Sequence, residues 1–409
     1  MRNENHFMKL VYIIGTYPSL TTTFIDREIR ALRGWGVEVQ VVSIRRGQNQ
    51  VSAEQEMLRE GVIYLLPVSP FKLLMANLYF ILFAPLRYFG TLLYLITRPH
   101  RSLKSRLMTF LHFFEGVDAA YVLRSHIFHD IHAHFVDRAA TVAMAASRLL
   151  GRPYSVTAHA RDIYVDPVIL PEKLAGARFV ATCTAYNKSH LSSIINDANK
   201  IRCIYHGMDV ERYQPKPRAE GKTLVLSVGQ LKEKKGFPYL FEACQLLKEQ
   251  GYDFKCEIIG EGPLHNSLQT EIERLGLKDT VVLLGAQAHQ NVIRKYEEAQ
   301  VFVLPAVPGS DGDRDGIPNV ILEALAMELP VISTQHSGIP EVIESGVNGL
   351  LVPVEDANSL AKAIAEVLDN PTLGRSFGER GRKKVMEGFS IDANVGKLLN
   401  EFQLIAGEN

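Results

Sequence analysis

The stretch GSDGDRDGIPNVILEA, residues 309–324, decides the fold. An apolar run at residues 301–305 precedes it and predicts a buried strand. Pro318 fits the first turn of a following helix, because the N–H group that proline lacks would have no partner there. Residues 319–327 are good helix formers. A strand, a polar loop and a helix start together predict the edge at which open α/β sheets bind their ligands.

The chemistry of this loop suits a ligand that carries both phosphate and sugar. The start of a helix offers free N–H groups and partial positive charge to a phosphate. Asp315 and Glu323 are anionic and would repel phosphate, but their carboxylates accept hydrogen bonds from paired sugar hydroxyls. The alternative is a surface loop followed by an exposed helix with a solvated glutamate, so the rest of the chain must decide.

Length and charge predict two domains with different partners. A chain of 409 residues exceeds most single cores. The net charge is zero, but residues 1–200 hold 23 basic and 15 acidic side chains, a balance of +8. The remainder therefore holds 22 basic and 30 acidic side chains, a balance of −8. The basic half suits an anionic membrane surface or a phosphate-bearing acceptor, and we expect no nucleic-acid partner.

Cysteine usage and the N-terminus predict a cytoplasmic protein. The four cysteines have no C-x-x-C spacing and lie in or beside apolar runs, so we expect reduced thiols rather than disulfides or zinc ligands. The apolar run at residues 10–14 is too short for a signal peptide.

The pattern of apolar runs predicts parallel βαβ units in both halves. Runs at residues 9–15, 37–44 and 62–66 predict strands, with an amphipathic helix at 24–32 between the first two. Residues 206–218 hold a turn and a proline-containing polar segment, which predicts a domain boundary there. We therefore expect domains at 1–207 and 208–388, with a C-terminal helix at 389–409 that packs back on the first. Further strands are expected at 154–158, 179–184, 202–205, 223–228, 254–259, 281–285 and 331–334, and further helices at 137–150, 356–368, 373–387 and 391–405.

Residues 71–106 combine apolar and basic side chains. The longest uncharged stretch, residues 73–86, is 14 residues long, short of the roughly 20 needed to span a bilayer. Pro85 predicts two short helices in place of one long helix. These helices fit either a protein core or, with the basic residues around them, peripheral docking on a membrane surface.

Histidines mark a second place of interest. Four of them lie within residues 126–134, but two would fall on a strand with no evident carboxylate partner, which argues against a metal site. His159 follows the predicted strand 154–158 and should lie at the ligand edge of the sheet. Asp162 could orient its ring, although a purely structural pair is the alternative.

Two glycine-containing loops precede the opening stretch. Residues 229–236 place Lys235 just before a helix, which suits a phosphate, although such loops are often simply solvated. Residues 260–263 begin like the dinucleotide motif G-x-G-x-x-G, but His265 replaces its third glycine, so a dehydrogenase is not expected.

These blocks resemble the retaining glycosyltransferases of family 4, which have the GT-B fold: two Rossmann-like doubly wound parallel-sheet domains facing across a cleft. The first half resembles the bacterial exopolysaccharide (colanic-acid-type) branch less specifically. The matching blocks are residues 228–236, 259–264, 301–305, 315–324, 330–334 and 338–352 in the second half, and 17–25, 132–135 and 157–164 in the first.

The resemblance implies a role for each matching residue. Lys235 would hold the donor diphosphate, Asp315 would contact the donor sugar, and Glu323 would hold the ribose hydroxyls. The N–H groups of Gly316, Ile317, Pro318 and Asn319 would face sugar and phosphate, and His159 would lie beside the transferred sugar. Gly15, Gln230, Gly260 and Gln287 complete the expected donor site, and Thr21, Thr22, His134 and Asp162 the vicinity of acceptor or sugar.

Three residues depart from the family pattern. Gln230 stands where the family has an arginine beside Lys235, Asp315 is one methylene shorter than the usual glutamate, and Thr22 stands where this branch has glutamate. Asp311 and Asp313 precede Asp315, but we expect that loop to be solvated. We expect no metal and no cofactor, since Lys235 and the helix start can stabilise the leaving diphosphate.

The sequence therefore predicts a metal-independent retaining hexosyltransferase of exopolysaccharide biosynthesis. It would use a UDP- or GDP-sugar as donor and a lipid-linked oligosaccharide as acceptor, in the cytoplasm or peripherally on the membrane's cytoplasmic face. A sugar-nucleotide epimerase with the same fold, or a catalytically silent nucleotide-sugar-binding or scaffold protein, is the alternative.

Overall fold

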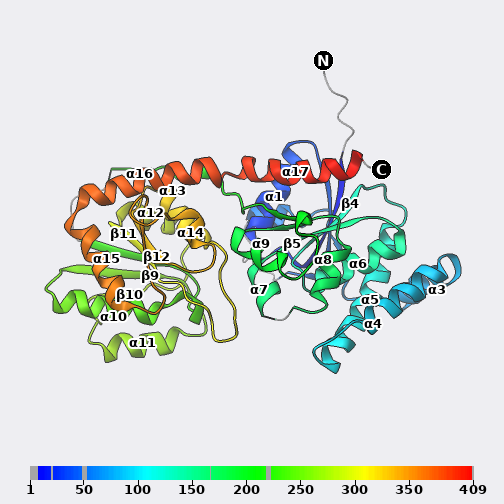
Figure 1. Cartoon of the computed structure of the whole chain (residues 1–409), viewed down its shortest axis with the longest axis horizontal. Helices are drawn as coiled ribbons and strands as arrows, with labels where there is room; N and C mark the ends of the chain where they lie inside the picture. Colours follow the sequence, from blue (N-terminus) through cyan, green and yellow to red (C-terminus); the bar gives the residue numbers. More distant parts are fainter. Residues whose placement is uncertain (1–7, 20–21, 48–52, 166, 218–222, 408–409) are drawn as a thin grey trace, which may run out of the picture. The chain divides into compact units, whose positions relative to one another are not determined.

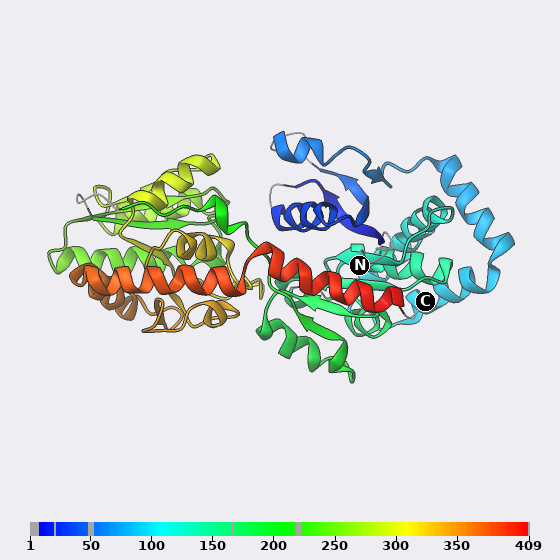
Figure 2. The same ribbon diagram turned by 90° about the horizontal axis from the view of Figure 1, so that it is seen from above.

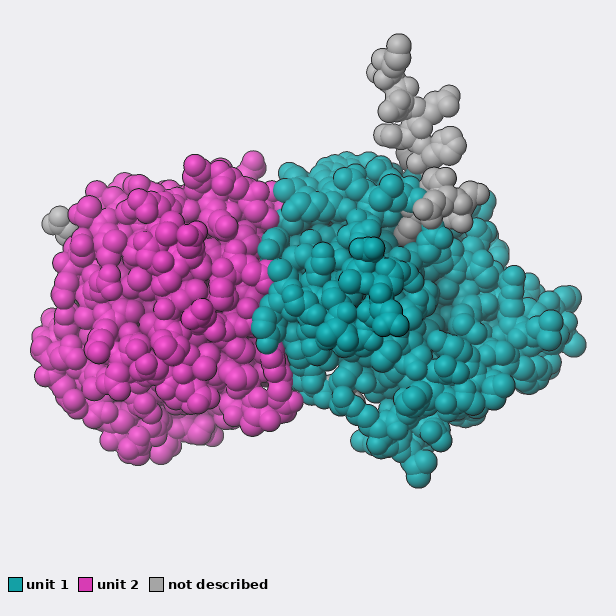
Figure 3. All heavy atoms as spheres, in the orientation of Figure 1, with its two compact units in different colours: residues 1–207, 391–409 teal, residues 208–390 magenta. Residues whose placement is uncertain are grey.

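The computed structural model describes residues 8–19, 22–47, 53–165, 167–217 and 223–407 (Figure 1). The chain divides into two compact units, which Figure 3 colours separately. Unit 1 comprises residues 1–207 together with 391–409, and unit 2 comprises residues 208–390. Each unit is built on one parallel sheet with helices packed against it.

Unit 1 contains a seven-stranded sheet in the order β3-β2-β1-β4-β5-β6-β7. All of its strand pairs are parallel. The order of the strands along the chain reverses between β1 and β4, and doubly wound sheets bind their ligands at such a point. β1 runs two residues past the glycine at which the sequence predicted its end, and β3 is shorter than predicted. The strands are β1 (Lys9–Tyr17), β2 (Glu38–Arg46), β3 (Ile63–Tyr64), β4 (Asp130–His134), β5 (Tyr154–Ala158), β6 (Val180–Thr182) and β7 (Ile201–Cys203).

Alternation along β1 fills two cores, one on each face of this sheet. Val11 and Ile13 join the core formed with α5 and α6, whereas Tyr12 and Ile14 join the core formed with α1 and α17. Phe402 of α17, which is 1% exposed, belongs to the second core, so the last helix completes unit 1. The helices of unit 1, besides the outer ones below, are α1 (Thr23–Gly34), α2 (Ala53–Met57), α6 (Arg138–Leu150), α7 (Ala160–Tyr164), α8 (Leu170–Gly176), α9 (Ala185–Ser192) and α17 (Ile391–Gly407).

Three helices form an outer layer on unit 1: α3 (Pro70–Phe83), α4 (Pro85–Thr97) and α5 (Leu103–Leu123). α5 packs on α6, and α3 and α4 pack on α5 (Figures 1 and 2). The break before Pro85 confirms the prediction of two short helices. None of the described helices is by itself long and apolar enough to cross a bilayer, but α3 and α4, bent by 113°, satisfy that test as a pair in length and composition alone.

Unit 2 contains a six-stranded parallel sheet in the order β10-β9-β8-β11-β12-β13. The order reverses between β8 and β11, so the loops that follow these two strands lie at its switch point. The strands are β8 (Thr223–Val228), β9 (Phe254–Ile259), β10 (Val281–Leu283), β11 (Val301–Leu304), β12 (Val331–Thr334) and β13 (Leu350–Val352). The helices are α10 (Phe237–Glu249), α11 (His265–Arg274), α12 (His289–Glu298), α13 (Asn319–Ala326), α14 (Ile339–Val342), α15 (Ala357–Asp369) and α16 (Pro371–Gly388).

Candidate functional site

In unit 2, the loops after β8 and β11 are held together directly. The backbone N–H of Val307 donates to the carbonyl of Lys234 at 3.0 Å. Glu233 accepts from the backbone N–H of Ser310 at 3.0 Å and from its hydroxyl at 2.7 Å. The lysine-containing loop and the loop of the opening stretch therefore form one structure.

Charged side chains meet where these loops join. The Asp315 carboxylate lies 2.5 Å from Lys235 Nζ and 3.1 Å from Lys234 Nζ, and Lys234 also pairs with Asp313 at 3.0 Å. Burial by itself would raise the pKa of Asp315, but the ammonium groups of Lys235 and Lys234 outweigh it and lower the pKa to about 2. Asp315 is therefore ionised at neutral pH.

The burial of Asp313 contradicts our expectation that this loop is solvated. Asp313 is 7% exposed and paired with Lys234, because the loop folds against the lysines instead of extending into solvent.

Two glycines allow the loops to approach so closely. Gly236 has φ +68°, and a Cβ there would lie 1.8 Å from the carbonyl oxygen of Pro305. Gly260 has φ +148°, and a Cβ there would lie 1.9 Å from the carbonyl oxygen of Gly229. Its N–H donates to Gly285 at 3.0 Å, so Gly260 acts here as a site of close backbone packing.

The start of α13 faces the same region of unit 2. The helix begins at Asn319. Pro318 precedes it with an extended backbone, so the helix starts one residue later than the sequence predicted. Pro318 has no N–H to offer, but those of Gly316, Ile317 and Asn319 have no acceptor within the described residues. They are available to an anion.

Glu323 is fixed by a residue that the sequence did not single out. The hydroxyl of Tyr296 on α12 donates to Glu323 Oε2 at 3.1 Å. Tyr296 is fully buried, and its burial and the nearby carboxylate raise its pKa well above the ordinary value. It stays protonated and holds one oxygen of Glu323.

The remaining expected donor residues lie at the surface of their units. Gln230 is exposed and its carbonyl accepts from the N–H of Lys232 at 2.8 Å. Gln287 is also exposed, and its amide donates to the carbonyl of Leu284 at 2.8 Å. Gly15 lies on β1 and lines a cavity of unit 1. It is therefore in a different unit from the other expected donor residues, which belong to unit 2.

The histidines of unit 1 gather at the carboxyl ends of its strands. His159 follows β5 and is 6% exposed, with ring centroids 5.8 Å from His134 and 5.1 Å from His206. Phe24 stacks on His206 at 4.2 Å. Burial first, and then the neighbouring imidazoles, lower the pKa of His159 well below its ordinary value, so its ring is neutral.

The role of Asp162 differs from the expectation that it orients the ring with its carboxylate. Its carboxylate instead accepts from the backbone N–H of His159 at 2.9 Å and from that of Val136. Burial raises the pKa of Asp162 to about 8. Asp162 belongs to the first turn of α7, and its side chain reaches back to the backbone N–H of His159, which directly precedes the helix. This contact stabilises the turn into α7.

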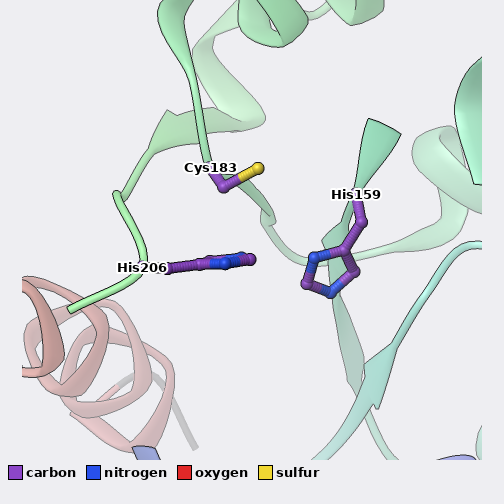
Figure 4. Close-up of side chains that lie close together, drawn as sticks. All are labelled: His159, Cys183 and His206. Atoms are coloured by element: carbon purple, nitrogen blue, oxygen red, sulfur yellow. The ribbon is translucent and has the colours of Figure 1, made fainter. Parts of the chain in front are cut away.

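Two groups of side chains approach metal-ligand geometry. His159, Cys183 and His206 place their ligand atoms within 4.8 Å of one another (Figure 4). The other group contains His134, whose Nε2 is 3.1 Å from Glu28, together with His132. His132 already bonds Ser155 at 2.7 Å and Thr157 at 2.8 Å through its two ring nitrogens, which makes the second group a hydrogen-bond network.

A cavity of about 600 Å³ opens beside these residues in unit 1. Its lining includes Thr22, which directly precedes α1, is 9% exposed and donates its hydroxyl to the carbonyl of Ser19 at 3.2 Å. Thr21, also expected near the acceptor, lies outside the described residues. Basic side chains line this cavity: Arg101, Lys104, Arg138 and Arg161.

Sequence reasoning missed Lys234, Tyr296, Glu28 and His206 as members of these sites. His206 could have been found, since it follows the residues of β7 at the same sheet edge as His159. Tyr296 is on a helix with no motif around it, and only the folded structure brings it to Glu323.

Comparison with known proteins agrees with this architecture. The family model for glycosyl transferases group 1 matches residues 209–384. The chain is 40% identical over 210 residues to the putative colanic acid biosynthesis glycosyltransferase WcaL of Salmonella typhimurium, covering 50% of this chain and 52% of that protein. It is 43% identical over 166 residues to the amylovoran biosynthesis glycosyltransferase AmsK of Erwinia amylovora, covering 40% and 41%. The chain spans about half the length of the curated relatives it matches.

Solved structures show the fold. A glycosyltransferase from Rickettsia africae superposes with a TM-score of 0.73 at 17% identity, covering 98% of this chain and all of that one. HepE of Anabaena, in complex with UDP and glucose, gives 0.67 at 16% identity over 96% and 99%. The lipopolysaccharide outer core galactosyltransferase WaaB gives 0.69 at 17% over 97% and 99%.

Two doubly wound parallel-sheet units define the GT-B fold, so the predicted fold class is confirmed. The region that matches the model for glycosyl transferases group 1 makes up nearly all of unit 2.

Proposed function

We propose that this protein is a retaining glycosyltransferase of exopolysaccharide biosynthesis, which transfers a hexose from a UDP- or GDP-sugar to a lipid-linked oligosaccharide at the cytoplasmic face of a membrane. The observation that carries the proposal is the charged centre of unit 2. Lys235 and Lys234 lie beside Asp315, next to the helix start that offers free N–H groups. Glu323, held by Tyr296, lies one turn into that helix.

Each group has a distinct task in this transfer. The lysines and the N–H groups bind the diphosphate, and Glu323 accepts from a pair of ribose hydroxyls. The bond between the sugar's C1 and the diphosphate oxygen breaks, and the acceptor oxygen forms a bond to C1 on the same face. The acceptor proton moves to the departing phosphate oxygen, so the reaction needs no protein nucleophile and retains the anomeric configuration.

The charge that a divalent metal supplies in many phosphate sites is supplied here by the lysines and the helix start. Retention of full transfer activity in excess chelator would support metal independence, and activity restored only by added Mg²⁺ or Mn²⁺ would contradict it.

The cavity of unit 1 supports an anionic acceptor. Arg101 and Lys104, at the start of α5, place positive charge along its lining, whereas Arg138 on α6 is neutralised by an ion pair with Glu115. Such a lining attracts the phosphate groups by which a saccharide is joined to a lipid carrier. Thr22 and Asp162 lie on the same lining, which supports their proposed place near the acceptor or the sugar. Gly15, which we expected in the donor site, lines the same cavity.

The surroundings of His159 support its proposed place beside the transferred sugar. The Nε2 atom of His159 is buried and has no hydrogen-bond partner within the described residues. Because the ring is neutral, this nitrogen can exchange one hydrogen bond with a hydroxyl of the transferred sugar.

Calorimetry with Glu323→Ala and Tyr296→Phe tests the donor assignment. Loss of the carboxylate should abolish measurable binding of the UDP- or GDP-sugar that the wild type prefers, and loss of the tyrosine hydroxyl should weaken it about 5- to 10-fold. Glu297→Ala, next to Tyr296 on α12 and paired with Lys216 instead of Glu323, is the matched control. Unchanged donor affinity in Glu323→Ala would contradict the assignment.

Product analysis then separates the reaction classes. NMR of the product should show the anomeric configuration of the donor retained. Formation of an epimer without acceptor would favour the epimerase, and tight donor binding without turnover would favour a silent binding protein. The exposed Gln230, which cannot neutralise a phosphate, is the feature that makes the silent protein worth testing.

A further inference from the structure

The outer layer of unit 1 exposes an unusual concentration of apolar side chains. Of the 22 large hydrophobic residues that are exposed in the described chain, 13 lie on residues 71–111 of α3, α4 and α5. Soluble surfaces carry such residues singly, and contiguous groups of them mark interaction sites. We call these 13 the apolar face: Phe71, Leu74, Met75, Leu78, Leu82, Phe83, Leu86, Phe89, Leu93, Leu103, Leu107, Met108 and Leu111.

The apolar face of α3 is separate from the side that packs on the protein. Exposed positions recur at 71, 74, 75, 78 and 82, the spacing of one side of a helix. The opposite side carries Ala76 and Phe80, which are 0% and 2% exposed and belong to the core of unit 1. α3 therefore carries apolar residues on both sides, although only one side is covered by protein.

The next two helices repeat this arrangement. On α4, Leu86 is 89% and Leu93 is 60% exposed, whereas Leu95 is fully buried. On α5, Leu103 is 83% exposed, and Phe113 further along the helix is fully buried. The three outward stripes belong to helices that pack on one another, so they are parts of one surface layer (Figures 1 and 2).

The charged residues in the segment that carries the apolar face all have the same sign, although Lys72 is paired with Asp118 further along α5. Residues 61–114 contain six lysines and arginines and no aspartate or glutamate. Arg101, Lys104 and Arg106 are exposed, and none of them forms an ion pair with any residue that the structure describes. A partner that fits must be apolar and carry negative charge at its surface, which describes an anionic lipid bilayer.

The dimensions favour docking over spanning. α3 and α4 contain 14 and 13 residues, about 20 Å of helix each, and they are bent by 113°. The hydrocarbon core of a bilayer is about 30 Å thick. A bent pair of this length lies along the boundary between headgroups and acyl chains, with its inner side still on the protein.

We propose that the apolar face docks unit 1 on an anionic bilayer. In this arrangement α3 and α4 are immersed at the headgroup boundary, and the basic residues Arg101, Lys104 and Arg106 at the start of α5 contact lipid phosphates. The proposal rests on the surface of unit 1 and does not depend on the proposed transfer reaction. Its consequence for that reaction is proximity, since Arg101 and Lys104 also line the cavity of unit 1. A lipid-borne acceptor would meet that cavity at the membrane surface.

Vesicle flotation of the full chain tests the docking without any substrate. One set of vesicles is phosphatidylcholine alone, and a second contains about one third phosphatidylglycerol. The wild type should float with the anionic vesicles, less with the neutral ones, and less again in 0.5 M NaCl, which screens the basic residues.

Two sets of variants separate the apolar and the electrostatic contributions. Because their targets are exposed, the variants should keep the wild-type circular dichroism and melting temperature. The apolar set is Phe71→Glu, Leu82→Glu and Leu86→Glu, with Val282→Glu, Val347→Glu and Met386→Glu of unit 2 as its control. The charge set is Arg101→Gln, Lys104→Gln and Arg106→Gln, with Lys362→Gln, Lys384→Gln and Lys397→Gln as its control.

The expected results differ between the sets. The apolar set should weaken partitioning into both kinds of vesicle on the order of 100-fold, because three large side chains lose their burial. The charge set should remove only the preference for anionic lipid, and both control sets should float like the wild type. The proposal is overturned if the wild type floats with neither vesicle, or if the folded apolar set floats as well as its control. Sedimentation showing a dimer that the apolar set disperses, without flotation, would assign the face to a second copy and would equally overturn it.

Discussion

Replacing Asp315 with asparagine should tighten the binding of a free nucleoside diphosphate while it slows sugar transfer. Asp315 neutralises Lys235 at 2.5 Å and Lys234 at 3.1 Å. A diphosphate must therefore share these ammonium groups with a carboxylate of its own sign. The sugar, by contrast, loses an ionised acceptor for its hydroxyls when the carboxylate becomes an amide.

The size of both effects follows from the geometry. A phosphate oxygen about 3 Å from Lys235 lies within about 5 Å of the carboxylate. Coulomb's law at that distance gives roughly 1–3 kcal/mol of repulsion for effective dielectric constants of about 20–80. The affinity for UDP or GDP should rise about 5- to 150-fold. The kcat should fall about 10- to 100-fold, because the sugar loses its charge-assisted hydrogen bond to the Asp315 carboxylate.

Calorimetry with UDP and GDP at low and high salt measures the first effect, and the gain should shrink as salt screens the charges. Asp311→Asn is the control, because Asp311 accepts from the N–H of Asp313 at 2.8 Å, as an amide oxygen can, and forms no ion pair among the described residues. Unchanged or weaker diphosphate binding in Asp315→Asn would refute the competition between carboxylate and phosphate.

Three further outcomes concern stability. Gly260→Ala should destabilise unit 2 by about 3 kcal/mol or more in urea unfolding, because the new Cβ meets the carbonyl of Gly229, whereas Gly276→Ala, also at positive φ but with open space around it, should cost only about 1 kcal/mol. The ion pairs lower the pKa of Asp315 from 3.8 to about 2, so they contribute about 2 kcal/mol above pH 4 that is lost as the pH falls toward 2. The difference in unfolding free energy between wild type and Asp315→Asn should shrink accordingly, and a constant difference from pH 5 to 2.5 would contradict it. Phe402→Ala should cost unit 1 about 3–5 kcal/mol, and a smaller loss would mean that α17 is not part of its core.

The fold could be predicted because its signals are local. Apolar runs of strand length recur between helical patterns, and both sheets form from them in the parallel arrangement that this alternation predicts. Pro85 divides α3 from α4 because a proline in the interior of a helix removes a backbone hydrogen bond and its ring clashes with the preceding turn, so Pro85 begins a new helix instead.

The site could be predicted only where a motif carries it. Asp315, Lys235 and Glu323 follow strands or start helices, so their positions at the sheet edge follow from the sequence. Lys234 and Asp313 stand beside expected residues, but the way the loop folds decides which of them pair. Asp162 was assigned the right neighbour and the wrong atom, because spacing along the chain does not say whether a carboxylate reaches a ring or a backbone N–H.

Because α17 belongs to unit 1, the order in which the chain is synthesised affects how unit 1 can fold. The chain makes 207 residues of unit 1, then the whole of unit 2, and only then the helix that brings Val395, Leu398 and Phe402 to the core of unit 1. Unit 2 can therefore fold on the ribosome while one face of the first sheet is covered by α1 but still lacks α17. A chaperone that binds exposed apolar strands should contact the nascent chain at β1 and β4, where Tyr12 and His132 lie against Phe402, until α17 emerges, and release it afterwards.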